Sequence, residues 1–291
     1  MNVSQISATS RLFSSAVFKE LAVKGWSALF ARLLDQSGLT PALSSTVGEV
    51  FEKAFATLRT VGMRDEYVFK AALTHKVLLG THSLKTASML TEFRAGNCKA
   101  DMVILNGTAT VYEIKSERDS LSRLERQLAA YRKVFTKAYV IAAEDHVEGV
   151  KRCAPEEVGI LCLTRRFQIR TVRPAIEDPS QICPETLFDS LRAGEAEQVL
   201  TRLGADLPQV PNTQLYAAQK ALFRQFDAAT LHFEAVRVLK SSRNLAPLAS
   251  LVNDLPPSLH AAALTISIRQ RDHATLVEAV NTPVGRALEW A

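Results

Sequence analysis

The chain has 291 residues, with 47% hydrophobic side chains, 22% charged side chains and a net charge of +5. This composition is typical of a folded globular protein and excludes intrinsic disorder, and the length suits one large domain or two of ordinary size. Most of the positive excess lies in residues 61–175, and residues 176–291 are net negative. The centre of the chain is therefore the part best suited to face a polyanion such as nucleic acid.

The first eighty residues are predicted to be helical. Apolar side chains recur near the helical period over residues 10–36 and again over residues 44–58, and Gly38 and Pro41 separate the two runs. A third helix is predicted over residues 64–79. Glu66 and Lys70 lie four residues apart on one face of that helix.

The next segment alternates in the manner of β-structure. Residues 88–93, 99–105 and 108–115 predict three strands, and Asn106-Gly107 is typical of a two-residue hairpin turn. Capping-type residues at 116–119 predict a helix that continues to Phe135 with a clear apolar stripe. Residues 138–143 then predict a buried, parallel strand, and residues 159–163 and 168–172 extend the sheet.

Beyond Pro174 the chain changes character. A stretch rich in proline and polar residues reads as a linker, and helical periodicity follows from Glu185 onward. We therefore predict three segments: N-terminal helices (1–60), a core with a mixed central sheet flanked by helices (61–175), and an all-helical C-terminal module (176–291). The last segment is a candidate surface for self-association or for a protein partner.

The residues with chemical potential lie around the predicted hairpin. Glu113 and Lys115 are two apart and so project from the same face of one strand. Pairing about the Asn106-Gly107 turn places Asp101 opposite Tyr112 or Glu113. Two carboxylates and an ammonium at one end of a sheet suit a hard divalent cation such as Mg²⁺. The alternative from spacing alone is an ordinary salt bridge between Glu113 and Lys115.

The same residues resemble a known signature. Asp101, followed at a distance by Glu113-Ile114-Lys115, is similar to the motif of the PD-(D/E)xK nuclease superfamily, although Ala100 stands where a proline is usual. The predicted order of helix, three strands, helix and strand resembles the core of that superfamily, and Gln127 and Tyr131 resemble its Gln-x-x-x-Tyr element. Over residues 64–143 the chain is similar to a largely uncharacterised bacterial group within it.

The resemblance implies roles for individual residues. Asp101, Glu113 and the carbonyl of Ile114 would ligate Mg²⁺ or Mn²⁺, and Lys115 would be the catalytic lysine. Gln127 and Tyr131 would reach the site from the following helix. The superfamily often adds an acidic residue from an early helix or strand. Glu66 and Glu92 are the two candidates, each weighed against a plain surface role.

The resemblance implies a restriction-endonuclease-like α+β fold and a metal-dependent nuclease that hydrolyses phosphodiester bonds, with DNA as the expected substrate. The alternative is a protein that keeps this fold and binds nucleic acid, or serves as a regulator or adaptor, without cleaving.

The cysteines and the N-terminus bear on location. None of the four cysteines is spaced as Cys-x-x-Cys, the first 20 residues lack the apolar run of a signal peptide, and no apolar stretch is long enough to span a bilayer. These features predict a cytoplasmic protein without a membrane partner.

Overall fold

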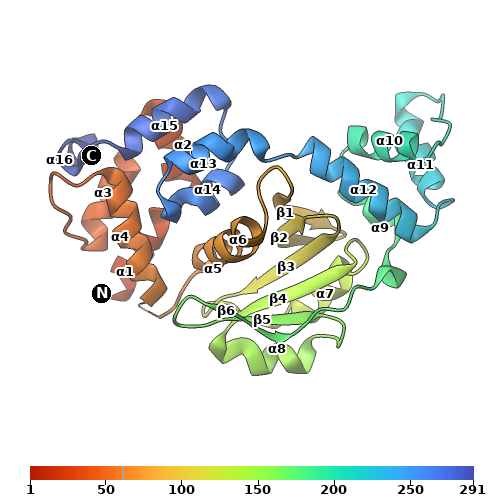
Figure 1. Cartoon of the computed structure of the whole chain (residues 1–291), viewed down its shortest axis with the longest axis horizontal. Helices are drawn as coiled ribbons and strands as arrows, with labels where there is room; N and C mark the ends of the chain where they lie inside the picture. Colours follow the sequence, from red (N-terminus) through yellow and green to blue (C-terminus); the bar gives the residue numbers. More distant parts are fainter. Residues whose placement is uncertain (61) are drawn as a thin grey trace.

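The computed structural model describes residues 1–60 and 62–291. Its centre is a six-stranded mixed sheet in the order β1-β2-β3-β4-β5-β6 (Figure 1). The strands are β1 (Ser88–Ala95), β2 (Cys98–Leu105), β3 (Ala109–Lys115), β4 (Lys137–Ala143), β5 (Gly159–Leu163) and β6 (Ile169–Arg173). β1, β2 and β3 are antiparallel, β3, β4 and β5 are parallel, and β6 returns antiparallel to β5. The predicted strands and the mixed sheet are thus confirmed.

The hairpin between β2 and β3 forms at Asn106-Gly107, as the sequence predicted. Its loop has three residues, 106–108, and not the two expected, because Leu105 pairs with Ala109. Asn106 donates its backbone N–H to the Thr108 carbonyl at 3.1 Å, and Gly107 has a φ of 115°, which favours glycine. The register pairs Met102 with Tyr112. One position further along, Asp101 therefore stands beside Glu113.

Helices cover both faces of the sheet. On one face lie α5 (Glu66–Leu73), a π-helical turn (Thr74–Leu78) and α6 (Leu79–Thr81). On the other lie α7 (Leu124–Tyr131) and α8 (Val147–Cys153) (Figure 1). The side chains divide accordingly. Phe69 packs in one core with Tyr112 and Ile114, whereas Leu128 packs in the other with Val111.

Two predicted helices are differently bounded in the structure. Residues 10–36 form parts of three helices, α1 (Val3–Arg11), α2 (Ser15–Lys24) and α3 (Ala28–Ser37), because Ser14 and Ser27 act as N-caps for α2 and α3. The helix expected from residue 116 begins only at Leu124. The Asp119 carboxylate accepts hydrogen bonds from the N–H and hydroxyl of Ser116 at 2.8 and 2.6 Å, which forms a local turn instead.

The two ends of the chain pack against each other. α1 to α3 and α4 (Val47–Thr60) lie with the last helices, α13 (Ala249–Asp254), α14 (His260–Thr265), α15 (His273–Val280) and α16 (Val284–Ala287). Val47 donates its N–H to the Thr282 carbonyl at 2.9 Å, and Val284 donates to Ser45 at 2.7 Å. Together they extend the core on the α5 face.

A second group of helices extends the core on the α7 face. It consists of α9 (Pro184–Ser190), α10 (Ala193–Arg202), α11 (Asn212–Phe223) and α12 (Ala228–Ser242) (Figure 1). Short 3-10 turns connect elements at Glu144–His146, Pro179–Gln181, Ala246–Leu248, Pro257–Leu259, Gln270–Asp272 and Leu288–Trp290. Residues 176–291 thus contribute to both cores. Among the described residues, no helix has the length and apolar character that crossing a membrane requires.

Candidate active site

A buried ion pair occupies the end of β3. Lys115 Nζ lies 2.7 Å from Glu113 Oε1, and both side chains are almost fully buried. Both project toward α7, where the side-chain carbonyl of Gln127 accepts a second hydrogen bond from Lys115 Nζ at 3.1 Å. The ammonium is therefore fixed between two oxygens. The salt bridge between Glu113 and Lys115 that spacing alone allowed is therefore present, and it is buried, whereas ordinary surface pairs remain in water.

Tyr131 holds the other oxygen of Glu113. Its hydroxyl lies 2.6 Å from Glu113 Oε2 and 2.7 Å from the Lys99 carbonyl. Burial, followed by the negative charge of Glu113, raises the pKa of Tyr131 well above its usual value. The phenol therefore stays protonated. Its single proton serves one acceptor at a time, and the charged carboxylate makes the stronger bond.

Asp101 stands beside this pair on β2. Its Oδ2 accepts a hydrogen bond from the backbone N–H of Ile114 at 2.7 Å. Burial, followed by the charge of Glu113, raises the pKa of Asp101 to about 8, although the Ile114 N–H and Lys70 act in the opposite direction. Because the N–H and C=O of one strand residue face the same neighbouring strand, the Ile114 carbonyl also faces β2.

Two further carboxylates meet Asp101 from the other side. One oxygen each of Glu66 on α5, Glu92 on β1 and Asp101 on β2 lie within 4.8 Å of one another. Lys70 is 2.6 Å from Glu66 and 4.0 Å from Glu92, and Lys99 is also 4.0 Å from Glu92. The structure therefore brings both Glu66 and Glu92 to Asp101, where the sequence analysis treated them as alternatives.

A local irregularity brings Glu92 into this position. Leu90 and Phe93 both pack into the core on the α7 face, although an odd spacing along a regular strand would place them on opposite faces. Ala100 and Val103 show the same change on the paired strand. The switch centres on Glu92, whose φ of 53° lies in the left-handed region. Such backbone is sparsely populated by non-glycine residues and is concentrated at functional sites.

The charge balance of the site suits a cation. Four carboxylates, carried by α5, β1, β2 and β3, lie in this part of the molecule, and three lysines, Lys70, Lys99 and Lys115, pair with them. The pKa of Asp101 is raised first by burial and then by Glu113, because ionising the Asp101 carboxyl adds a negative charge beside another in a poorly solvated place. Carboxylate and carbonyl oxygens are the ligands that Mg²⁺ and Mn²⁺ prefer. The donor set therefore fits such an ion.

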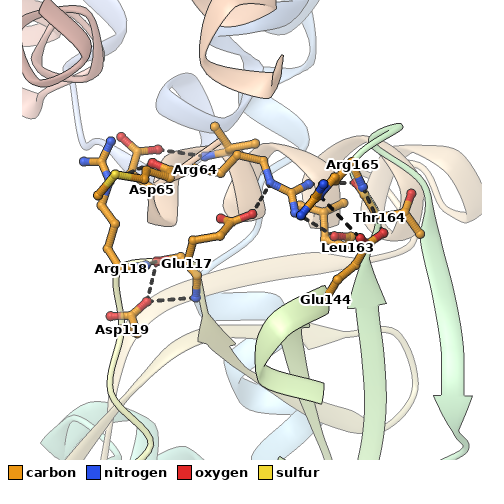
Figure 2. A network of polar contacts seen from close by, with 12 residues as sticks. Arg64, Asp65, Glu117, Arg118, Asp119, Glu144, Leu163, Thr164 and Arg165 are labelled. Carbon is orange, nitrogen blue, oxygen red and sulfur yellow. Dashed lines mark hydrogen bonds and ion pairs between the residues drawn. The ribbon is translucent and has the colours of Figure 1, made fainter. Parts of the chain in front are cut away.

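A second polar network fixes the helix that carries Glu66. The buried Arg64 guanidinium donates to Glu117 Oε1 at 2.6 Å, to the Thr164 carbonyl at 2.7 Å and to the Leu163 carbonyl at 2.8 Å (Figure 2). It thereby ties the residues before α5 to the loop after β3 and to the end of β5.

Neighbouring residues extend this network. Asp65 caps α5 by accepting from Val68 N at 3.2 Å, and Arg118 donates to the Met63 carbonyl at 2.7 Å (Figure 2). Sequence reasoning missed Arg64 and Glu117. Asp65 could have been recognised as a capping residue directly before an apolar periodic run.

Four arginines follow β5, namely Arg165, Arg166, Arg170 and Arg173, and the first and last of them have different surroundings. Arg173 donates to the carbonyls of Val158, Ala154 and Pro155 at 2.9, 3.2 and 2.7 Å, and so closes the end of α8. Arg165, by contrast, is exposed and pairs with Glu144 (Figure 2).

Comparison with known sequences places the chain in a family. Residues 60–253 match the family described as Bacteriophage P4 protein cII. The chain belongs to this family. One curated relative, Protein cII of Enterobacteria phage P4, is 32% identical over 80 residues, which is 27% of this chain and 30% of that protein. The match therefore spans less than a third of this relative. No solved structure matches the chain. The family region contains every residue of the candidate site, from Glu66 to Tyr131.

Proposed function

We propose that the chain is a metal-dependent nuclease with a restriction-endonuclease-like core, acting on DNA. The observation that carries the proposal is the constrained position of Lys115. Its buried ammonium is held between Glu113 and Gln127 at the end of β3. Directly beside it lies the Asp101 carboxyl, whose raised pKa means that a bound cation would favour its ionised form. A structural ion pair alone would not need the Asp101 carboxyl beside it, nor Glu66 and Glu92 with carboxylate oxygens within 4.8 Å of that of Asp101.

The carboxylates and one backbone carbonyl would bind the metal ion that phosphodiester hydrolysis needs. Asp101, Glu113 and the Ile114 carbonyl would hold Mg²⁺ or Mn²⁺, and Glu66 and Glu92 are placed to complete the shell directly or through water. A bound ion supplies Lewis-acid stabilisation and lowers the pKa of its water.

The protein side chains supply orientation and fixed charge. Tyr131 donates to Glu113 Oε2 and so fixes the rotamer of that carboxylate, while Gln127 restrains the ammonium of Lys115. Lys115 is thereby preorganised to stabilise the negative charge that develops on a phosphoryl oxygen.

One assay tests the proposal. Purified protein is incubated with plasmid, linear and single-stranded DNA in Mg²⁺ or Mn²⁺, with EDTA as a blank, beside Glu113→Gln and Lys115→Met. The matched control is a second Glu–Lys pair of the same 2.7 Å length, Glu148 and Lys151, which lies exposed on α8. Glu148→Gln and Lys151→Met should cut at the wild-type rate. Removing a metal ligand or charge stabiliser at the site should lower the rate by at least 100-fold, as is typical of such losses.

Two results would count against the nuclease. Cleavage that persists in both site variants would show that other residues do the chemistry. Tight DNA binding by the wild type with no cleavage in either metal would favour a non-cleaving binding protein. Circular dichroism of each variant establishes that it is folded.

A further inference from the structure

Two hollows lie side by side next to the exposed edge of the sheet. The larger, of about 510 Å³, is bounded by β1 and by the segments that follow α12 and α14. The smaller, of about 370 Å³, lies between the loop before β1 and α12. Asn244 lines both hollows, so they are direct neighbours. We call the two hollows together the basic cleft.

The lining of the basic cleft is strongly one-sided in charge. Among the described residues, no acidic side chain lines it. Its five basic side chains are Lys85, Arg192, Arg237, Lys240 and Arg243. Arg243 is neutralised by a bidentate pair with Glu195, and Arg237 pairs with Glu234 at 3.0 Å. Within the same described residues, the other three take part in no ion pair.

The two halves of the basic cleft differ in chemistry. The smaller hollow is lined mainly by long basic side chains, two lysines and an arginine. The larger hollow has a partly exposed apolar floor that includes Leu248, Ile266 and Ile268. Around that floor stand hydrogen-bonding side chains such as Thr265 and Gln270. A ligand that fills both halves must combine repeated negative charge with flat, apolar faces that carry polar edges.

The basic cleft leads to the carboxylates. Thr91 lines the larger hollow and directly precedes Glu92 on β1. Since a strand rises about 3.3 Å per residue, the hollow reaches within one residue of the Glu66, Glu92 and Asp101 cluster. A chain lying in the cleft would pass from the basic half, over the apolar floor, to the proposed site of hydrolysis.

We propose that the basic cleft binds an unpaired DNA strand, with phosphates at Lys85, Lys240 and Arg192 and a nucleobase on the apolar floor of the larger hollow. This inference rests on the proposed function, and it narrows the substrate to single-stranded or locally opened DNA. A duplex keeps its base faces stacked inside, so it would leave the apolar floor uncovered. An unpaired strand can place a base there and its phosphates beside the cations.

The charge half of the proposal is tested by binding without cleavage. Fluorescence anisotropy of a labelled oligo-dT is measured in EDTA as a function of salt, for the wild type and for Lys85→Ala/Lys240→Ala. Each phosphate contact on a single strand contributes about 0.7 to the slope of log K against log salt, so the double variant should lose about 1.4 from the slope. At about 0.1 M salt this corresponds to roughly 25-fold weaker binding. Lys19→Ala/Lys53→Ala, which removes two exposed lysines from the N-terminal helices, should bind like the wild type.

The proposed nucleobase contact is tested in two ways, by removing the bases from the DNA strand and by filling the larger hollow. An abasic strand of the same length carries the same phosphates and should bind at least tenfold more weakly than oligo-dT. Ser267→Phe, which places a ring in the larger hollow, should abolish that difference while the salt slope stays unchanged.

The outcomes separate this inference from the nuclease itself. Equal binding of duplex and single strand, equal binding of abasic and normal strands, or a Lys85/Lys240 variant that binds like the wild type would each overturn the basic cleft. A protein that binds oligo-dT through these lysines but never cuts would leave the cleft intact and overturn only the nuclease. If Glu113→Gln abolishes cleavage but Lys85→Ala/Lys240→Ala leaves it unchanged, the nuclease proposal stands and the proposed role of the basic cleft is wrong.

Discussion

Replacing Arg64 by methionine should destabilise the fold by about 3–5 kcal/mol, the usual cost of removing one partner of a buried ion pair. The Arg64 side chain is 2% exposed and makes bonds to Glu117, Thr164 and Leu163. Glu117 is itself mostly buried, and its Oε2 atom has no hydrogen-bond partner among the described residues. The substitution therefore leaves a carboxylate without its cation and removes the Arg64 hydrogen bond from two carbonyls, of which that of Thr164 still accepts from Phe167 N–H at 2.9 Å.

The magnitude can be divided between these losses. Each lost carbonyl bond is worth about 1 kcal/mol, and the uncompensated charge of Glu117 accounts for the remainder. The double variant Arg64→Met/Glu117→Leu removes that charge as well. It should recover most of the loss and remain about 1–2 kcal/mol below the wild type, which represents the two carbonyls.

Urea unfolding at pH 7, followed by circular dichroism, measures these differences. The denaturant midpoint should shift while the slope with urea stays constant, since the surface exposed on unfolding hardly changes. Arg32→Met on the exposed face of α3 is the control and should stay within about 0.5 kcal/mol of the wild type. The reasoning fails if Arg64→Met costs less than about 1 kcal/mol, or if adding Glu117→Leu makes the protein still less stable.

Three further substitutions have defined outcomes. Gly159→Ala should cost about 1–3 kcal/mol in urea unfolding, because a Cβ there would lie 2.2 Å from the ring of Tyr139, and a wild-type midpoint would contradict this packing. Burial lowers the pKa of His232 from 6.5 to about 4, so its contribution to stability is present above pH 6.5 and is lost as the pH falls through 4. His232→Leu should therefore lose less stability than the wild type between pH 7 and pH 4.5, and parallel losses would show that His232 is not responsible. Burial and then Glu113 raise the pKa of Asp101 from 3.8 to about 8, so the stability that it contributes in metal-free protein is full below pH 3.8 and falls as the pH rises through 8. Asp101→Asn should be more stable than the metal-free wild type at pH 9 and should lose this advantage when Mg²⁺ is added to both; an advantage that Mg²⁺ leaves unchanged would argue against a metal at Asp101.

Local sequence signals were sufficient for the sheet and its hairpin. The Asn106-Gly107 turn and the alternation around it predict the β2–β3 hairpin and place Asp101 opposite Tyr112 or Glu113. The observed register, one residue from that of a two-residue turn, selects Glu113. Gln127 and Tyr131 could be placed at the same end because one helical turn separates them.

Other features depend on tertiary context. The alternation of side chains between the two faces of β1 is interrupted at Glu92 by a left-handed backbone conformation, and no residue in the sequence predicts this conformation. Arg64 reaches partners 53 and about 100 residues away in sequence, and such pairing has no periodic signature. The basic cleft likewise combines Lys85 with Arg192 and Lys240, which are distant in sequence and meet only after folding.

The packing of the two chain ends has a consequence during synthesis. Lys24, the last residue of α2, and His273, the first residue of its partner α15, are 249 positions apart (273 − 24). At roughly 5–20 residues per second a ribosome needs about 12–50 s to make the intervening chain. Throughout that time the part of the α2 surface that α15 covers has no native partner, although α1 to α4 can already pack against one another. Nascent chains of this protein should therefore engage chaperones early and release them late, after the sheet has already formed.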